Sequence, residues 1–193
     1  MPKMTIYTDG GVHGSPPVAD KKLLAVSAYY MEFEDGSTFS EVKILKNTKD
    51  KVHIVQMSEA IAIYMALRHL LVCDPTIISD TKVTLYTDSE EMFKILHSKK
   101  NPHKVPTTQE KPIKKHPELD YGRILIKCEL LIKQIHHKFN LTVHIEQLPR
   151  RSDYGSKLVD NLCNWAMGTY EDYYNLKYCD TGDLLRSHTK IAE

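Results

Sequence analysis

Hydrophobic and polar residues alternate along several short segments of this chain, and in other segments the apolar positions recur every three to four residues. Alternation is typical of a strand with one buried face, and the longer period is typical of an amphipathic helix. The alternating segments lie near residues 4–9, 23–33, 38–45, 82–87 and 141–148, and the helical ones near 56–73, 89–97, 121–139 and 155–168. The resulting order, β-β-β-α-β-α-α-β-α, predicts one α/β domain.

Turn and loop signals separate these segments. Gly10 to Asp20 is rich in Gly, Pro and Ser and is predicted to be a loop, and Asp35-Gly36 predicts a hairpin turn. Residues 98–117 contain six lysines and one acid, which predicts a basic loop insertion, either a solvated connection or a contact to phosphates. The domain is expected to cover residues 1–168, with a C-terminal extension over 169–193.

Composition narrows the class of protein. With 26 basic and 25 acidic residues, the formal charge is +1, so any nucleic-acid contact must come from local patches. The four cysteines show no paired metal-binding spacing, which favours free thiols in a reducing compartment. The most apolar stretch, Ala60–Cys73, is interrupted by Arg68 and His69, and the N-terminus lacks a secretory pattern. A cytoplasmic protein without a membrane partner is expected.

One pentapeptide pattern occurs twice, at residues 5–9 (TIYTD) and 84–88 (TLYTD). Each is an alternating run that ends at an aspartate, Asp9 or Asp88, and these could simply cap a turn. If the two strands are neighbours, however, the carboxylates meet. Two negative charges at such a short distance are stable together when a hard cation lies between them, and this predicts a Mg²⁺ site.

A third acid lies on an apolar helical face. Glu59 comes one turn before the apolar stripe formed by Ala62, Ile63, Ala66 and Leu70. Such a carboxylate either emerges at the edge of the core, where it can be paired, or is a solvated residue favoured by the helix N-terminus.

Four motifs in this order resemble those of the ribonuclease H family. They are Tyr7-Thr8-Asp9-Gly10-Gly11, Gln56-Met57-Ser58-Glu59-Ala60, Tyr86-Thr87-Asp88-Ser89 and Gly155-Ser156-Lys157-Leu158-Val159-Asp160-Asn161-Leu162. With the connecting strands, the resemblance covers roughly residues 4–168. It implies a ribonuclease H-like fold, with a central five-stranded mixed β-sheet flanked by α-helices.

The resemblance also implies an activity, which is metal-dependent hydrolysis of the RNA strand of RNA-DNA hybrids. Two Mg²⁺ ions, for which Mn²⁺ is expected to substitute, would be held by Asp9, Glu59, Asp88 and Asp160, which are the catalytic residues. Substrate contacts are expected from Gly10, Gly11, Gln56, Ser89 and Arg150. For Gln56, a local hydrogen bond at the helix start is an equal alternative.

The chain departs from the family pattern at Arg150, where many members carry a mobile histidine. An arginine does not transfer protons near neutral pH, but it can hold a phosphate. The loop at residues 12–17 also differs from the family's usual form. Two alternatives therefore remain, namely a nucleic-acid-binding or assembly module with weak or lost activity, and a related nuclease with a different substrate.

Overall fold

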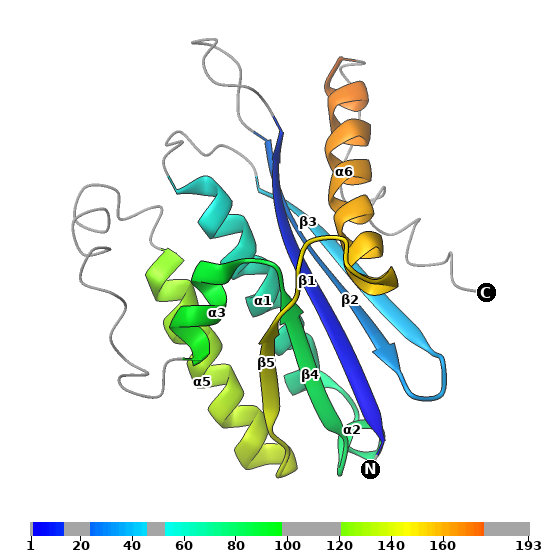
Figure 1. Cartoon of the computed structure of the whole chain (residues 1–193), viewed down its shortest axis with the longest axis vertical. Helices are drawn as coiled ribbons and strands as arrows, with labels where there is room; N and C mark the ends of the chain where they lie inside the picture. Colours follow the sequence, from blue (N-terminus) through cyan, green and yellow to red (C-terminus); the bar gives the residue numbers. More distant parts are fainter. Residues whose placement is uncertain (1, 14–23, 46–52, 98–120, 176–193) are drawn as a thin grey trace.

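Five strands form one mixed sheet in the order β3-β2-β1-β4-β5 (Figure 1). The computed structural model describes residues 2–13, 24–45, 53–97 and 121–175. Strand β1 pairs antiparallel with β2 and parallel with β4; β2–β3 is antiparallel and β4–β5 is parallel. The predicted five-stranded mixed sheet is thus confirmed. The strands are β1 (Lys3–His13), β2 (Leu24–Phe33), β3 (Thr38–Leu45), β4 (Lys82–Thr87) and β5 (Val143–Gln147).

Helices cover both faces of the sheet (Figure 1). They are α1 (Ile54–Val72), α2 (Pro75–Ile78), α3 (Glu90–His97), α5 (Tyr121–Phe139) and α6 (Tyr154–Asn175). The pattern of apolar residues did not predict α2, because four residues are too short to show a helical period. Its start is nevertheless encoded locally, since Asp74 accepts a hydrogen bond from the Thr76 amide and Pro75 occupies the first turn.

Two apolar clusters bury the two faces. On one face, Ile6 and Leu85 pack with α1 and α5, and α1 is apolar on nearly all sides because it lies between the sheet and α5. On the other face, Val26 and Ala28 pack against Val159 of α6. The alternation along each strand therefore places successive residues in different clusters, as the period of two predicts.

The two copies of the pentapeptide pair with each other in register. Thr5 lies opposite Thr84, and Tyr7 lies opposite Tyr86, along the parallel β1–β4 ladder. The Tyr7 and Tyr86 rings stack with their centroids 5.4 Å apart. Gly155, at the start of α6, lies so close to the Tyr7 ring that a Cβ there would overlap it. The register brings the ends of both strands, and hence Asp9 and Asp88, to the same edge.

The predicted loop from Gly10 is wrong at its start, because β1 continues through both glycines to His13. Gly10 and Gly11 pair with Ser27 and Val26 of β2. A Cβ on Gly10 would lie 2.5 Å from the Ser58 carbonyl carbon of α1, and one on Gly11 would lie 3.0 Å from the Met167 side chain of α6. These glycines allow close helix packing instead of forming a turn.

Several predictions concern segments outside the described residues. They include the remainder of the predicted loop at residues 14–20, the basic segment at 98–117 and the end of the extension from residue 176. Helix α6 crosses residue 168 and ends at Asn175, and the division into domain and extension stays a prediction. Among the helices that the structure does describe, none has the length and apolar character needed to span a membrane.

Candidate metal centre and active site

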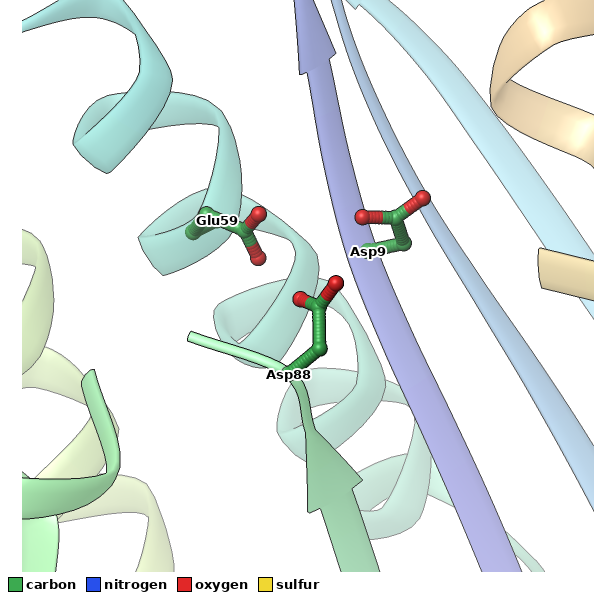
Figure 2. Close-up of side chains that lie close together, drawn as sticks. All are labelled: Asp9, Glu59 and Asp88. Atoms are coloured by element: carbon green, nitrogen blue, oxygen red, sulfur yellow. The ribbon is translucent and has the colours of Figure 1, made fainter. Parts of the chain in front are cut away.

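Three carboxylates from three different elements point toward one another (Figure 2). Asp9 comes from β1, Glu59 from α1, and Asp88 from the end of β4. One oxygen of each lies within 4.8 Å of the others. Asp9 and Glu59 are buried, and Asp88 is half-buried. The expected meeting of Asp9 and Asp88 therefore occurs, and Glu59 joins them at the edge of the core.

Hydrogen bonds beside the strand ends position the two aspartates. Thr8 donates from Oγ1 to the Tyr86 carbonyl oxygen at 3.0 Å, which ties β1 to β4 one residue before Asp9 and two residues before Asp88. The Ser89 amide donates to Thr87 Oγ1 at 3.2 Å, and the Leu148 amide donates to the Thr87 carbonyl at 3.0 Å. Because these bonds flank Asp88 on both sides, its backbone is held at the end of the sheet.

Glu59 is positioned by the close contact between α1 and the sheet. The Ser27 hydroxyl of β2 donates to the Ser58 carbonyl at 2.7 Å, and both serines are buried. Ser58 in turn donates from Oγ to the Val55 carbonyl at 2.8 Å. Together with the missing side chain of Gly10, these contacts let α1 approach the strands closely enough to bring Glu59 to the aspartates.

The electrostatics of this cluster disfavour three negative charges. Burial, together with the neighbouring Asp88 and Asp160, raises the pKa of Asp9 to about 6, against smaller opposing effects from Arg150 and the Gly10 amide. Burial and the charges of Asp9 and Asp88 raise the pKa of Glu59 well above its ordinary value. Burial also raises the pKa of Asp88. The cluster is therefore short of positive charge.

The residues present fit a divalent cation. Glu59 Oε2 is buried and has no hydrogen-bond partner, so one lone pair in the cluster is left unsatisfied. Carboxylate oxygens are the ligands that Mg²⁺ and Mn²⁺ prefer. Asp9, Glu59 and Asp88 could each supply such an oxygen to a shared ion.

The fourth predicted acid, Asp160, lines the same cleft as Asp9 and Asp88 but has other partners. Arg150 donates to Asp160 Oδ1 from Nε at 3.1 Å and from Nη2 at 2.6 Å. Arg151 donates from Nε to Oδ2 at 2.8 Å, and also from Nη2. Burial opposes ionisation of Asp160, but the hydrogen bonds from these arginines outweigh it and lower its pKa.

A tight turn places the two arginines. The Ser152 amide donates to the Pro149 carbonyl at 3.1 Å, and Arg151 has a φ of 53°. A left-handed backbone is uncommon outside glycine and asparagine, which indicates that this turn is held by its surroundings. The turn leads into α6, where Asp153 Oδ1 accepts from the Ser156 amide at 2.8 Å and caps the helix.

The expected substrate-contact residues lie in different settings around the cluster. Gln56 is half-buried on α1, one turn before Glu59. Ser89 follows Asp88 and caps α3, since its Oγ accepts from the Met92 amide at 3.4 Å. Gly10 and Gly11 lie within the sheet, and Arg150 is bonded to Asp160. Their roles toward a substrate stay predictions.

Sequence reasoning gave Arg151 no role, although it binds Asp160 as fully as Arg150 does. A basic pair in a loop carries no periodic signal. Its contact depends on a turn that no pattern of apolar residues predicts.

Comparison with known proteins identifies a family for the chain and similar folds among solved structures. A family model described as RNase H matches residues 1–140. The N-terminal RNase H domain of rv2228c from Mycobacterium tuberculosis, solved as a fusion with maltose binding protein, is similar in fold at 18% identity. Its TM-score is 0.59, and the match covers 90% of this chain and 99% of that chain. LC9-RNase H1, a type 1 RNase H with the type 2 active-site motif, matches at 11% identity and a TM-score of 0.48, over 87% of this chain and 73% of its own. No curated protein matches the sequence.

Proposed function

The chain belongs to the ribonuclease H family, and we propose that it is a divalent-metal-dependent endonuclease that hydrolyses the RNA strand of RNA-DNA hybrids. The observation that carries this proposal is the cluster of Asp9, Glu59 and Asp88, in which a buried carboxylate oxygen has no partner. Three converging acids, two of them buried, destabilise a fold unless a cation binds them. A metal-dependent activity explains why the three acids converge.

Asp9, Glu59 and Asp88 would hold Mg²⁺ or Mn²⁺, with Asp160 as the fourth ligand in a two-ion site. Bound ions would supply a nucleophilic water near neutral pH and neutralise the charge that develops on the leaving oxygen. The protein's own part is to fix the three carboxylates on rigid elements. Arg150 and Arg151, whose side chains are more than half exposed, would bind backbone phosphates, since each guanidinium offers a planar set of donors.

The hybrid is proposed as substrate because the family acts on a sugar-phosphate backbone in which the 2′-hydroxyl distinguishes RNA from DNA. Gln56 supports this proposal by its place on the helix, three residues before Glu59 and therefore on the same side. An amide there can donate to and accept from a ribose hydroxyl. Ser89, directly after Asp88, is the second side chain proposed for sugar contact.

One observation favours a second candidate function, a nucleic-acid-binding module with weak or lost activity. Both oxygens of Asp160 accept hydrogen bonds from arginines. Of the four expected metal ligands, only the other three have no hydrogen bond from a cationic side chain in the described part of the chain. If the arginines stay bonded, the second ion would lack a ligand.

Incubation with an end-labelled RNA-DNA hybrid, double-stranded RNA and single-stranded RNA tests both candidates, each with Mg²⁺, Mn²⁺ or EDTA. The proposed activity predicts metal-dependent cleavage of the RNA strand of the hybrid alone, leaving 5′-phosphate ends. Asp88→Asn should abolish cleavage and keep hybrid binding within a few-fold, because binding depends on phosphates and sugars away from the ions.

The matched control is Glu90→Gln, which removes an exposed acid two residues away that is paired with Lys94. This variant should cleave like the wild type. Cleavage of the DNA strand, or full activity in Asp88→Asn, would refute the proposal. Tight hybrid binding without cleavage under any metal would favour the binding module.

A further inference from the structure

Asp160 is a buried acid whose hydrogen-bonding capacity is already used. Its side chain is 3% exposed, and it accepts five hydrogen bonds, two from Arg150, two from Arg151 and one from Asn164 Nδ2 at 2.8 Å. A carboxylate offers about four lone-pair directions. In this arrangement Asp160 therefore has no free lone pair for a metal ion.

The neighbouring carboxylate cluster, in contrast to Asp160, has hydrogen-bonding capacity that is not used. Asp9, Glu59 and Asp88 repel one another, and Glu59 Oε2 has no partner. Arg150 affects them through its charge, yet the hydrogen bonds of both arginines that the structure describes in this cleft go to Asp160. Among the described residues, both arginines thus hydrogen-bond to Asp160, while Asp9, Glu59 and Asp88 accept no hydrogen bond from a cationic side chain.

The arginines differ from Asp160 in exposure. Their side chains are 66% and 55% exposed, so they reach inward from solvent and cover the buried carboxylate. Of each guanidinium, Nε and Nη2 bond to Asp160, and no bond from Nη1 to a described residue occupies the remaining donors. A backbone phosphate matches the guanidinium fork as well as a carboxylate does.

We propose that Arg150 and Arg151 hold Asp160 in the free protein and release it when phosphates of a nucleic acid bind them, so that Asp160 becomes a metal ligand only with substrate present. This inference rests on the proposed metal-dependent function, because it assigns a condition to the fourth ligand of that site. The arginines act as positioning residues through Asp160.

The exchange conserves favourable contacts. A buried carboxylate that loses its arginines without replacement is strongly unfavourable, so their departure must be matched by the arrival of another cation. A metal ion shared with the neighbouring cluster satisfies Asp160, and the phosphates satisfy the arginines. Nucleic acid and the metal held by Asp160 then raise each other's affinity by the same factor.

Mn²⁺ titration followed by electron paramagnetic resonance, without nucleic acid, tests whether the arginines keep Asp160 from binding metal in the free protein. Wild-type protein should bind one Mn²⁺ tightly. Arg150→Gln/Arg151→Gln should gain a second site at least about tenfold tighter than any second wild-type site, within the usual range of such couplings. Adding Asp160→Asn to this pair should abolish the gain. Lys127→Gln/Lys157→Gln removes the same charge from exposed positions and should bind like the wild type.

The outcomes separate the two proposals. Absence of Mn²⁺ binding by the wild type would overturn the proposed function and this inference with it. One site in both the wild type and the arginine pair variant, or two tight sites in the wild type, would overturn this inference alone.

The release of Asp160 on nucleic-acid binding is tested on wild-type protein by ¹⁵N nuclear magnetic resonance of the arginine Nε–H groups. The single Arg→Gln variants assign these resonances. The probe is a short hybrid whose RNA strand is 2′-O-methylated, added with Mg²⁺. Because both Nε–H groups donate to Asp160 in the free protein, their resonances should move when the probe binds. Unchanged Nε resonances at saturating probe would overturn the release of Asp160.

Discussion

Gly10 of β1 lies against the backbone of Glu59 at the first turns of α1, with no room for a Cβ between them. This contact sets the distance between the sheet and the helix that carries the third carboxylate. The buried bond from Ser27 to the Ser58 carbonyl holds the same junction. The geometry of the carboxylate cluster therefore depends on a residue that has no side chain.

Gly10→Ala should destabilise the protein by about 1–3 kcal/mol, since a methyl group forced into a packed backbone contact requires α1 to shift. The same shift moves Glu59 away from Asp9 and Asp88, so Mn²⁺ affinity should fall as well. Urea unfolding and Mn²⁺ titration measure the two effects. The control is Gly168→Ala, at an exposed helical position with open space, which should be stabilised by about 0.5–1 kcal/mol. Unaltered stability in Gly10→Ala would contradict the packing argument.

The sequence could predict most elements because hydrophobic periodicity reports which face of each segment is buried. The strands at 38–45 and 82–87 and the helix at 121–139 occur with the bounds expected. For Glu59 the same reasoning left two settings open, the edge of the core and a solvated helix start, and the structure shows a buried residue on the helical face of Ala62 and Ile63. Local pattern and tertiary burial agree in these segments.

Elsewhere a residue's role depends on a distant partner. Gly10 and Gly11 looked like the start of a loop, because glycine pairs commonly mark turns in a sequence. Their role comes from α1 and α6, which approach β1 from opposite faces. The partners of Asp160 escaped prediction for a related reason, because they depend on the left-handed backbone of Arg151 in a short turn.

Divalent metal should raise the thermal stability of the protein. Mg²⁺ or Mn²⁺ binds the folded state only, so about 100 times its dissociation constant contributes roughly 2.7 kcal/mol. For a domain of this size, that corresponds to an increase in Tm of roughly 5–10 °C. Scanning calorimetry with metal and with EDTA measures it.

Asp88→Asn should lose most of this increase and should be slightly more stable than the wild type in EDTA, because one repelling charge is gone. Glu90→Gln should keep the full increase. An equal metal response in all three proteins would show that the ion binds elsewhere.

A second polar network, near the C-terminal end of α1, should contribute to stability and not to metal binding. Tyr29 donates from its hydroxyl to Glu41 Oε2 at 2.9 Å, and the Tyr29 hydroxyl oxygen also lies 2.9 Å from His69 Nδ1. Tyr29→Phe removes the shared hydroxyl and should cost about 1–3 kcal/mol, since two polar groups lose a partner. Mn²⁺ affinity should not change. A double-mutant cycle with Glu41→Gln isolates the Tyr29–Glu41 bond, and an interaction energy near zero would show that this bond contributes nothing.

The stability of the metal-free protein should depend on pH through Asp9. Its pKa is raised from 3.8 to about 6, mainly by burial and by Asp88, so the folded state binds this proton more tightly than the unfolded chain. The stabilisation is complete below the ordinary pKa and is lost as pH rises through about 6, a loss of about 3 kcal/mol. Glu59 and Asp88, whose pKa values are also raised, act in the same direction.

Urea unfolding in EDTA at pH 4.5, 6 and 7.5 measures this dependence. The free energy of unfolding of Asp9→Asn, relative to that of the wild type, should increase as pH rises, since the amide has no proton to lose. Saturating Mg²⁺ at pH 7.5 should restore the wild type and not the variant. A difference between the two proteins that stays constant across this range would contradict the raised pKa of Asp9.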